Sequence, residues 1–421
     1  MQNNNNRDKL VVDEIKLFNE SISSKSREQK YKKMLRTPFY FFRGTNHLFW
    51  KDLYSDERLN LFANKNTNTW ILGDLHVCNI GIFNNAIEQI VFDFNDFDES
   101  FIGDFQFDIW RMAVSIILIA REVFDISTHE EEKIIEKFAE RYIKSVANFY
   151  ENNEALSLNF TKHNTKHQLE ERLKDAEDDK GVEDMLDKWT SIKDGERKLD
   201  NHEIIDISEQ KQKEIAQAMT DYGKTLSGKL KYDIIYFDIL DIAKRIDAGT
   251  GSLGIPRYYI LINGASDGKE TFRILDVKLQ NKPSAYLFLN DNDKKIFDKR
   301  FPSQAKRFVD ANKSLNLLHD NHLGYMLLYD GEYSVRQRSP YKSDFRYKDL
   351  KDKDALENQV KQWAEVIATT HVRAADTYFK KEIASIYNDK MKAFLTNVVE
   401  ISQEYADIVV NDYNIFSEWL K

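Results

Sequence analysis

Two nearby stretches, GDLHVCNIG at residues 73–81 and VFDFNDFDES at residues 91–100, decide how this chain is interpreted. Short apolar runs at residues 70–72 and 90–94 predict β-strands, because runs of this length fit buried strands. The residues between them, 79–85, are rich in Asn and predict a turn-containing loop. The sequence therefore predicts a strand, a loop and a second strand, with Asp and Asn side chains near the strand ends.

Three residues in these stretches suggest phosphoryl-transfer chemistry. Asp74 and Asn79 are five positions apart, and Asp93 follows fourteen positions after Asn79. Phosphoryl transfer needs a carboxylate that orients the nucleophile, plus an amide oxygen and a second carboxylate that hold Mg²⁺ against the phosphates. The spacing matches the catalytic loop and metal aspartate of kinases. The alternative is a pair of turns in which Asp and Asn cap their own backbones.

A glycine-rich segment, GTGSLG at residues 249–254, fits the pattern GxGxxG. By itself the pattern is typical of a dinucleotide site, of a kinase phosphate loop or of a simple turn. A dinucleotide site needs a helix to begin inside the motif, but Pro256 and the β-rich run RYYILI follow here. The sequence thus favours a glycine loop between antiparallel strands. The candidate cofactor-binding residues in it are Gly249, Gly251, Ser252 and Gly254.

The next predicted strand, FRILDVKLQ, places Lys278 among apolar neighbours. A buried ammonium is costly unless an anion pairs with it, and an ATP phosphate would supply that anion. The alternative is a lysine on an edge strand whose ammonium reaches solvent. The acidic partner of Lys278 is expected on the following helix, at residues 304–318, where we prefer Asp310 to the nearby Asp320.

Several other polar residues allow more than one interpretation. His371 lies on a predicted helix, WAEVIATTHVRA, and is expected to be a hydrogen-bonded core residue rather than a base or a ligand. Arg43, Arg336 and Arg338 could contact phosphate, or could equally bridge structural carboxylates. Three further acids could bind a second metal, attract a cationic substrate or cap the helix that begins near residue 105. They are Asp96, Asp98 and Glu99.

The 421 residues predict two or three packed units in a folded, mainly helical α+β chain, because apolar residues make up 42% and Gly and Pro are scarce. Residues 1–35 are predicted to be a frayed arm, residues 36–228 a helical large lobe with the catalytic and metal loops, and residues 229–335 a β-rich small lobe. Residues 336–421 are predicted to be helices that complete the large lobe.

Helical spacing is clearest from residue 105 onward, and two amphipathic helices are predicted at residues 354–378 and 381–419. Residues 151–220 are highly charged and predict a solvated or mobile excursion.

Charge and cysteine content exclude several classes of protein. The formal charge of −9 gives no general attraction to nucleic acid or to an anionic membrane. Cys78 is the single cysteine, which excludes an internal disulfide and fits a reducing compartment. The polar N-terminus does not resemble a signal peptide, and the longest apolar run, residues 113–120, is too short for a bilayer. We therefore expect a soluble, cytoplasmic protein without membrane insertion.

Nine motifs together resemble the uncharacterised bacterial family named domain of unknown function 2252. In chain order they are PFYFFRG, GDLHVCNIG, FDFNDFDES, FDIWRMAVSI, GTGSLG, DVKLQ, SVRQR, THVRA and YADIVVNDY. The resemblance covers most of the chain, from about residue 33 to residue 415, and is weakest at residues 150–230.

A more distant resemblance is to the aminoglycoside phosphotransferase and choline kinase branch of the protein-kinase-like fold. It implies that Asp74 is the catalytic base, that Asn79 and Asp93 are Mg²⁺ ligands, and that Lys278 pairs with a phosphate. It also implies that Asp108 braces the catalytic loop. ATP and Mg²⁺ would be the cofactors, and the acceptor a small-molecule or protein hydroxyl.

Two features depart from that pattern. An ordinary kinase places the glycine loop and lysine before the catalytic loop, whereas here they come after it, so the resemblance implies a circular permutation. Leu72 stands where many kinases have a histidine. Alternatives to the kinase are a nucleotidyl transferase, a regulatory pseudokinase, and a metallophosphoesterase that uses Asp74 and His76, although the further metal-binding motifs of that last class are missing.

Overall fold

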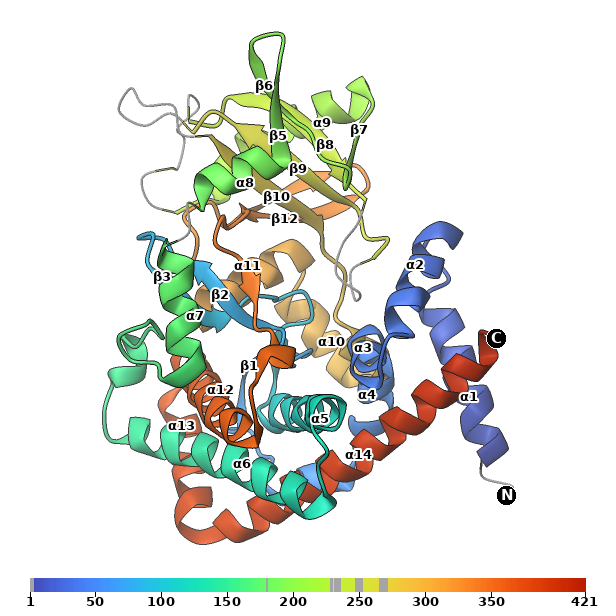
Figure 1. The fold of residues 1–421 in the computed structure, drawn as a ribbon, viewed down its shortest axis with the longest axis vertical. Helices are drawn as coiled ribbons and strands as arrows, with labels where there is room; N and C mark the ends of the chain where they lie inside the picture. The colour runs from blue at the N-terminus through green and yellow to red at the C-terminus, as the bar shows by residue number, and fades with distance from the viewer. Residues whose placement is uncertain (1–3, 179–180, 228–229, 231–235, 247–252, 265–271) are drawn as a thin grey trace.

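Helices make up most of the chain in the computed structural model, and six strands form one antiparallel sheet, drawn uppermost in Figure 1. The structure describes residues 4–178, 181–227, 230, 236–246, 253–264 and 272–421. The predicted α+β class and the predominance of helix are confirmed at this level. Within these ranges every helix is too short or too polar to cross a lipid bilayer.

Four long helices form the core of the helical part, which lies below the sheet in Figure 1. They are α5 (Gln106–Val123), α6 (Thr128–Tyr150), α12 (Lys353–Ala374) and α14 (Met391–Trp419). Residues 106–120 of α5 are all buried, because α5 is enclosed by α6, α14 and the N-terminal helices. The helix predicted from residue 105 onward is therefore confirmed, and it is a central core element.

The C-terminal helices differ in detail from the two predicted ones. After α12 ends, the Asp376 side chain accepts a hydrogen bond from the Phe379 amide and starts a new helix, α13 (Thr377–Ser385). A π-helical turn at Ile386–Lys390 then leads into α14. Apolar spacing alone predicts two helices here. The cap at Asp376 and the π-helical turn divide the same stretch into α12, α13 and α14.

The large sheet has an apolar core on each face. Its strands, from edge to edge, are β11 (Gly324–Leu328), β12 (Gly331–Gln337), β10 (Arg273–Leu279), β9 (Arg257–Ile262), β8 (Ile239–Arg245) and β7 (Ile204–Asp206). Alternate β9 residues pack toward opposite faces, where α9 (Glu209–Thr225) covers one side and α8 (Val182–Trp189) the other. Residues 182–225 therefore pack with this sheet. The β-rich part of the chain thus includes residues that precede the predicted boundary at position 229.

Several further elements lie between the long helices and the strands of the large sheet in the sequence. They are α7 (His167–Asp178), the hairpin of β5 (Thr190–Lys193) and β6 (Glu196–Leu199), α10 (Asp291–Arg300) and α11 (Gln304–Leu315).

The N-terminal segment is a packed part of the fold, not the frayed arm that its polar sequence predicts. Four helices follow one another: α1 (Asn4–Phe18), α2 (Ser24–Met34), α3 (Pro38–Gly44) and α4 (Asn46–Leu53). Val11 and Ile15 are fully buried. Arg7 forms ion pairs with Asp52 and Asp412, and so ties α1 to α4 and α14.

Small strands bring the two predicted loops together. The predicted strands are present as β1 (Asn68–Ile71) and β3 (Ile90–Phe94), and β2 (Ile80–Asn84) pairs with β3. β1 pairs with β4 (Phe101–Asp104), which comes directly after residues 95–100. This pairing places the segment that follows β3 beside the loop that follows β1.

Candidate functional site

Asp108 holds the loop that follows β1. Its carboxylate accepts hydrogen bonds from the Leu72 amide at 2.7 Å and from the Gly73 amide at 3.0 Å. His371 Nε2 lies 3.3 Å from the same carboxylate, and His371 Nδ1 lies 2.9 Å from the Tyr142 hydroxyl. The expected brace at Asp108 and the expected core role of His371 are confirmed. The Asp108 carboxylate binds the backbone amide of Leu72, so this contact does not depend on the side chain at position 72, where many kinases have a histidine.

Gly73 allows the two loops to approach closely. Its φ is +73°, and a Cβ there would lie 2.4 Å from the Glu99 carbonyl oxygen. The Gly73 carbonyl accepts hydrogen bonds from Trp50 Nε1 and Asn46 Nδ2, both at 3.1 Å. A side chain at this position would therefore push apart the loop after β1 and the segment after β3.

A cleft lies where these loops meet the N-terminal helices. The polar groups of the two loops that line it are Asp74, Asn79, Asp96, Asp98 and Glu99. The cleft brings together the predicted Asp74 and Asn79, and adds the three acids whose role the sequence left open. They do not cap α5, because Asp104 accepts the hydrogen bond from the Gln106 amide there.

Asp74 is a carboxylate with an unusual environment. Burial raises its pKa to about 6, although the Arg111 guanidinium, with Nε 2.7 Å from Asp74 Oδ1, opposes that rise. Asn79 Nδ2 donates to the Asp74 carbonyl oxygen at 2.8 Å and fixes the turn between them. A carboxylate with this pKa is half-ionised near pH 6 and mostly ionised at pH 7, where it can accept a proton.

Lys278 reaches the same region from β10. It is 9% exposed and pairs with the Asp98 carboxylate, which also accepts a hydrogen bond from Gln280 Nε2 at 3.0 Å. Burial would raise the pKa of Asp98, but the Lys278 ammonium lowers it overall. The solvent-facing alternative for Lys278 is therefore wrong.

The predicted acidic partner of Lys278, Asp310, is also wrong. Asp310 lies on α11 and pairs with Lys306, one turn earlier on the same exposed face, at 2.5 Å. The α11 residue that faces the site is Arg307, whose Nη2 donates to the Asp98 carbonyl oxygen at 2.7 Å. The helix points a guanidinium toward the cleft, and the acid comes from the segment after β3.

Asp93 is not among the residues that line the cleft. It lies within β3, where its carboxylate accepts a hydrogen bond from the Phe94 amide at 2.8 Å and lies 3.5 Å from Arg373 Nη1 of α12. Burial raises its pKa to about 6, against the opposing effect of Arg373. The structure thus gives Asp93 a guanidinium partner, and the acids of the following segment that line the cleft together with Asn79 are Asp96 and Asp98.

Most of the glycine-rich segment, including Gly249, Gly251 and Ser252, lies outside the described residues. Gly254 is described and has a φ of +87°, and a Cβ on it would lie 2.8 Å from Ile22 Cγ2. The next residue, Ile255, lines the cleft. The described end of the segment is therefore at the cleft, beside the turn between α1 and α2.

Lys30 is a cleft residue that the sequence did not indicate. It is 3% exposed, and its Nζ lies 5.2 Å from the centroid of the Phe18 ring. It forms no hydrogen bond or ion pair with another described residue, and burial lowers its pKa to about 8. The sequence around Lys30 is rich in lysine, which is typical of a solvent-exposed segment. Only the packing of α2 distinguishes the buried Lys30 from its exposed neighbours.

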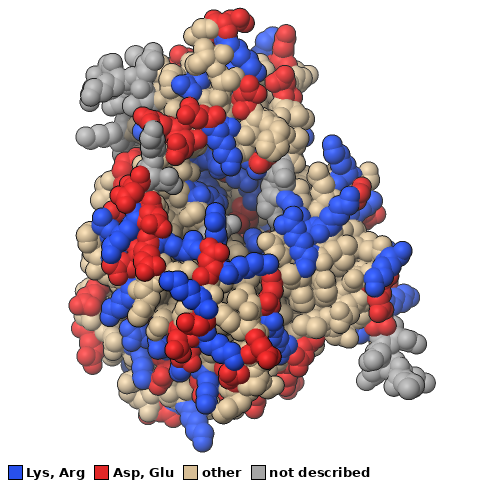
Figure 2. Space-filling view, viewed as in Figure 1, with Lys and Arg blue, Asp and Glu red and all other residues tan. Residues whose placement is uncertain are grey.

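The three arginines that the sequence singled out divide between two places. Arg43 lines the cleft, and its guanidinium lies 5.7 Å from the Tyr40 ring. Arg336 Nη1 donates to the Asn95 carbonyl at 3.0 Å, and the Arg338 guanidinium lies 4.7 Å from the Trp189 ring. In the space-filling view the surface is hollowed between the sheet and the helices, with Lys and Arg side chains around the hollow (Figure 2).

Among the described residues, the cleft offers oxygen-bearing side chains of the kind that Mg²⁺ prefers as ligands. Over the described ranges no three His, Cys, Asp or Glu side chains gather as a metal site would require. His76 Nε2 is 4.0 Å from Asp74, and its Nδ1 already accepts the Cys78 amide at 3.2 Å. Oxygen donors from Asn79, Asp96 and Asp98 match the one or two carboxylates that Mg²⁺ uses together with substrate phosphates.

Comparison with curated proteins and with solved structures gave no match. One family model matches residues 25–419, and its description is "Uncharacterized protein conserved in bacteria (DUF2252)". The match includes α2, both cleft loops, the sheet and α14. The chain therefore belongs to the DUF2252 family of bacterial proteins.

Proposed function

We propose that this protein is an ATP- and Mg²⁺-dependent phosphotransferase with a circularly permuted, kinase-like arrangement. The observation that carries the proposal is the meeting of Asp74, Asn79 and Asp98 at one cleft, with Lys278 brought to Asp98 from a distant strand. These are the residue types that phosphoryl transfer requires: a proton acceptor, oxygen ligands for Mg²⁺ and a phosphate-pairing cation.

The order of elements in space supports the permutation. The end of α12 lies beside β1, because Thr69 Oγ1 donates a hydrogen bond to the His371 carbonyl oxygen at 3.0 Å across 302 positions of sequence. Starting from β8, the chain passes the glycine-rich segment, Lys278 and α11, and α12 then leads in space to the Asp74 loop. This is the order of an ordinary kinase with the chain ends moved elsewhere.

Each residue then has a role. Asp74 accepts the proton of the attacking hydroxyl, and Arg111 keeps the carboxylate oriented. Asn79 and Asp96, with Asp98, offer the oxygen ligands, and bound Mg²⁺ would neutralise charge on the phosphates. Lys278 and Lys30 bring positive charge to the same cleft for the phosphates of ATP. The acceptor is a small-molecule or protein hydroxyl.

Calorimetric titration of ATP, with and without Mg²⁺, into the full chain tests the proposal. We expect Mg²⁺-dependent binding that is lost in Lys278→Met and Asp98→Asn and retained in Lys282→Met, a control on an exposed lysine that pairs with Asp298. Absence of Mg²⁺-dependent ATP binding to the wild type would refute the proposal.

The position of the label separates phosphoryl transfer from its alternative, AMP transfer. With ATP labelled at the γ or the α phosphate, we expect product that carries only the γ label. Transfer of the α label would identify a nucleotidyl transferase at the same cleft. Binding without any transfer would indicate a pseudokinase.

A further inference from the structure

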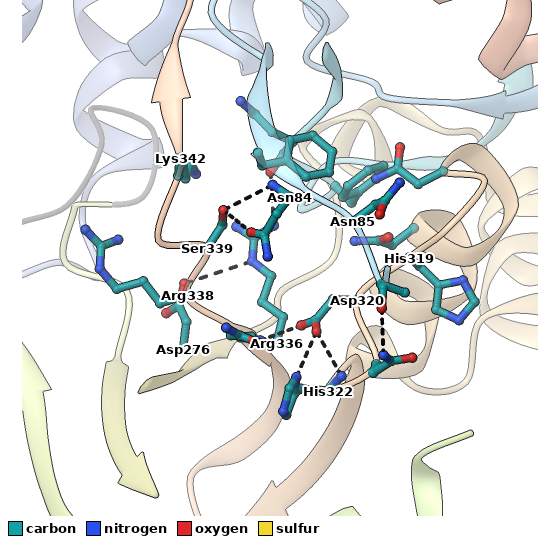
Figure 3. Close-up of a pocket in the computed structure, with 18 of the residues that line it drawn as sticks. Asn84, Asn85, Asp276, His319, Asp320, His322, Arg336, Arg338, Ser339 and Lys342 are labelled. Atoms are coloured by element: carbon teal, nitrogen blue, oxygen red, sulfur yellow. Dashed lines mark hydrogen bonds and ion pairs between the residues drawn. The ribbon is translucent and has the colours of Figure 1, made fainter. Parts of the chain in front are cut away.

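A second cavity lies between the large sheet and the β2–β3 hairpin (Figure 3). Its walls come from the hairpin, from the end of α11 with the loop after it, and from β9, β10 and β12. It has no lining residue in common with the catalytic cleft. It is therefore a separate candidate binding site.

Two acids of this cavity, Asp276 and Asp320, already have partners within the protein. The Asp276 carboxylate pairs with the Arg257 guanidinium through both of its oxygens. The Asp320 carboxylate accepts hydrogen bonds from the His322 amide and, at 2.9 Å, from His322 Nδ1, as Figure 3 shows. Because both carboxylates have partners within the protein, a ligand of the cavity need not supply a cation for them.

Three buried asparagines of the cavity each have a polar atom that has no hydrogen-bond partner among the described residues. They are the Nδ2 of Asn95 and the Oδ1 atoms of Asn312 and Asn316, in side chains that are 7%, 5% and 6% exposed. An unpaired buried amide group costs about 1–3 kcal/mol, so buried polar groups nearly always have partners. A ligand that both donates and accepts hydrogen bonds would satisfy these atoms.

Apolar side chains accompany the asparagines. Phe83, Phe94 and Phe97 line the same cavity. Asparagine amides pair well with the hydrogen-bonding edges of nucleobases, and apolar or aromatic walls accept their flat faces. A polyol would satisfy the amides equally well but would gain little from the phenyl groups.

We propose that this cavity binds the base of a purine nucleoside or nucleotide, recognised through the asparagine side chains. One short segment connects it to the cleft: Asn95 and Phe97 line the cavity, and Asp96 and Asp98 line the cleft. In naming the base-binding site of the nucleotide, the inference rests on the proposed function. It adds that the base is read by side-chain amides.

Titration of adenosine and guanosine into the full chain without Mg²⁺ tests the inference, because a nucleoside probes the base without phosphates. We expect one of them to bind the wild type, and Asn312→Leu to weaken that binding by about tenfold or more, as expected for a lost buried hydrogen bond. Asn152→Leu, a substitution at an exposed asparagine elsewhere, should leave binding unchanged. No nucleoside binding to the wild type, or equal binding by Asn312→Leu, would overturn the inference.

Asn312→Leu could fail to fold, and a measurement on the wild type covers that case. Side-chain amide NMR signals of the buried asparagines should shift when the nucleoside is added, and absence of any shift would overturn the inference. Binding of myo-inositol in place of either nucleoside would also overturn it, by indicating a polyol site.

The failures of the two proposals are distinguishable. Lys278→Met should retain nucleoside binding and lose the additional affinity for ATP with Mg²⁺, because Lys278 pairs with Asp98 of the cleft and does not line the cavity. ATP binding that requires Lys278, together with no nucleoside binding, would reject the base site and keep the phosphotransferase. Nucleoside binding that does not become tighter with phosphates and Mg²⁺ would keep the base site and reject the phosphotransferase.

Discussion

Lys278 and Asp98 are 180 positions apart in the chain, and their side chains form an ion pair. The ammonium comes from the middle of the antiparallel sheet, and the carboxylate from the segment that follows β3. Arg307 holds the same segment through the Asp98 carbonyl oxygen, so two cations from separate elements fix its position. The pair thus joins the sheet to the loops of the helical part.

The ion pair should appear in a double-mutant cycle. Lys278→Met and Asp98→Asn should each lower the free energy of unfolding, and the double variant should be more stable than the sum of the two effects predicts, by about 1–3 kcal/mol. The reason is that each single variant leaves one partner without its counter-charge. Urea denaturation monitored by circular dichroism measures this, and strictly additive effects would contradict the coupling.

The rate of transfer should rise with pH through about 6. Asp74 must be ionised to accept a proton, and burial raises its pKa to about 6, so activity is lost as pH falls below that value. Arg111→Met removes a charge that lowers the pKa of Asp74, and should move the midpoint to higher pH. Arg111→Lys keeps the charge and should move it less. If the midpoint of the kcat pH profile is the same in Arg111→Met as in the wild type, Asp74 is not the base.

Asp93 and Asp96 should respond oppositely to substitution. Asp93→Asn weakens the contact with Arg373 and should lower the free energy of unfolding by about 1–3 kcal/mol, with Mg²⁺-dependent ATP binding unchanged. Asp96→Asn removes a cleft carboxylate and should weaken that binding with little change in stability. Calorimetry and thermal denaturation of both variants decide between them. Loss of Mg²⁺ dependence in Asp93→Asn alone would restore the sequence-based assignment.

Lys30 should act on the nucleotide. Lys30→Met should weaken binding of ATP with Mg²⁺ by about tenfold or more, since a charge-assisted hydrogen bond contributes about 1.5–3 kcal/mol. Lys32→Met is the matched control, because Lys32 is on the same helix, 71% exposed and paired with Glu28. Titration calorimetry should show no change for the control. Equal affinity of Lys30→Met and the wild type would assign Lys30 to balancing the cleft acids alone.

Asp108→Ala should destabilise the whole fold. It leaves the buried amides of Leu72 and Gly73 and the ring of His371 without their acceptor, at a cost of about 3 kcal/mol. Asp407→Ala, whose carboxylate is 72% exposed, is the control and should cost less than about 1 kcal/mol. Thermal denaturation compares the two, and similar losses would mean that the carboxylate of Asp108 is not the brace.

Much of the local structure was predictable from sequence. The strands at residues 70–72 and 90–94, the core helix from residue 105 and the β-rich centre follow from apolar spacing, which is a local property. His371 was assigned correctly because it lies on a clearly apolar helix where a polar side chain needs a partner, whereas the contact of Asp108 with the loop was implied by the kinase-like resemblance.

The errors have a common cause. Asp310 is an acid at suitable spacing, but it faces solvent beside Lys306, and the acid that meets Lys278 is Asp98. Lys30 is one lysine in a lysine-rich run, and only the packing of α2 buries it. Spacing in sequence does not specify which partner a charged side chain meets, since that depends on elements far away in the chain.

The sequence by itself determined the elements of this protein, the family to which it belongs and the two loops that carry Asp74 and Asn79. Only the tertiary structure decided which charges meet: Lys278 with Asp98, and Lys30 with the cleft. The physical reason is range. Strand and helix patterns arise from neighbouring residues, whereas an ion pair across 180 positions exists only after the sheet and the helices have packed together.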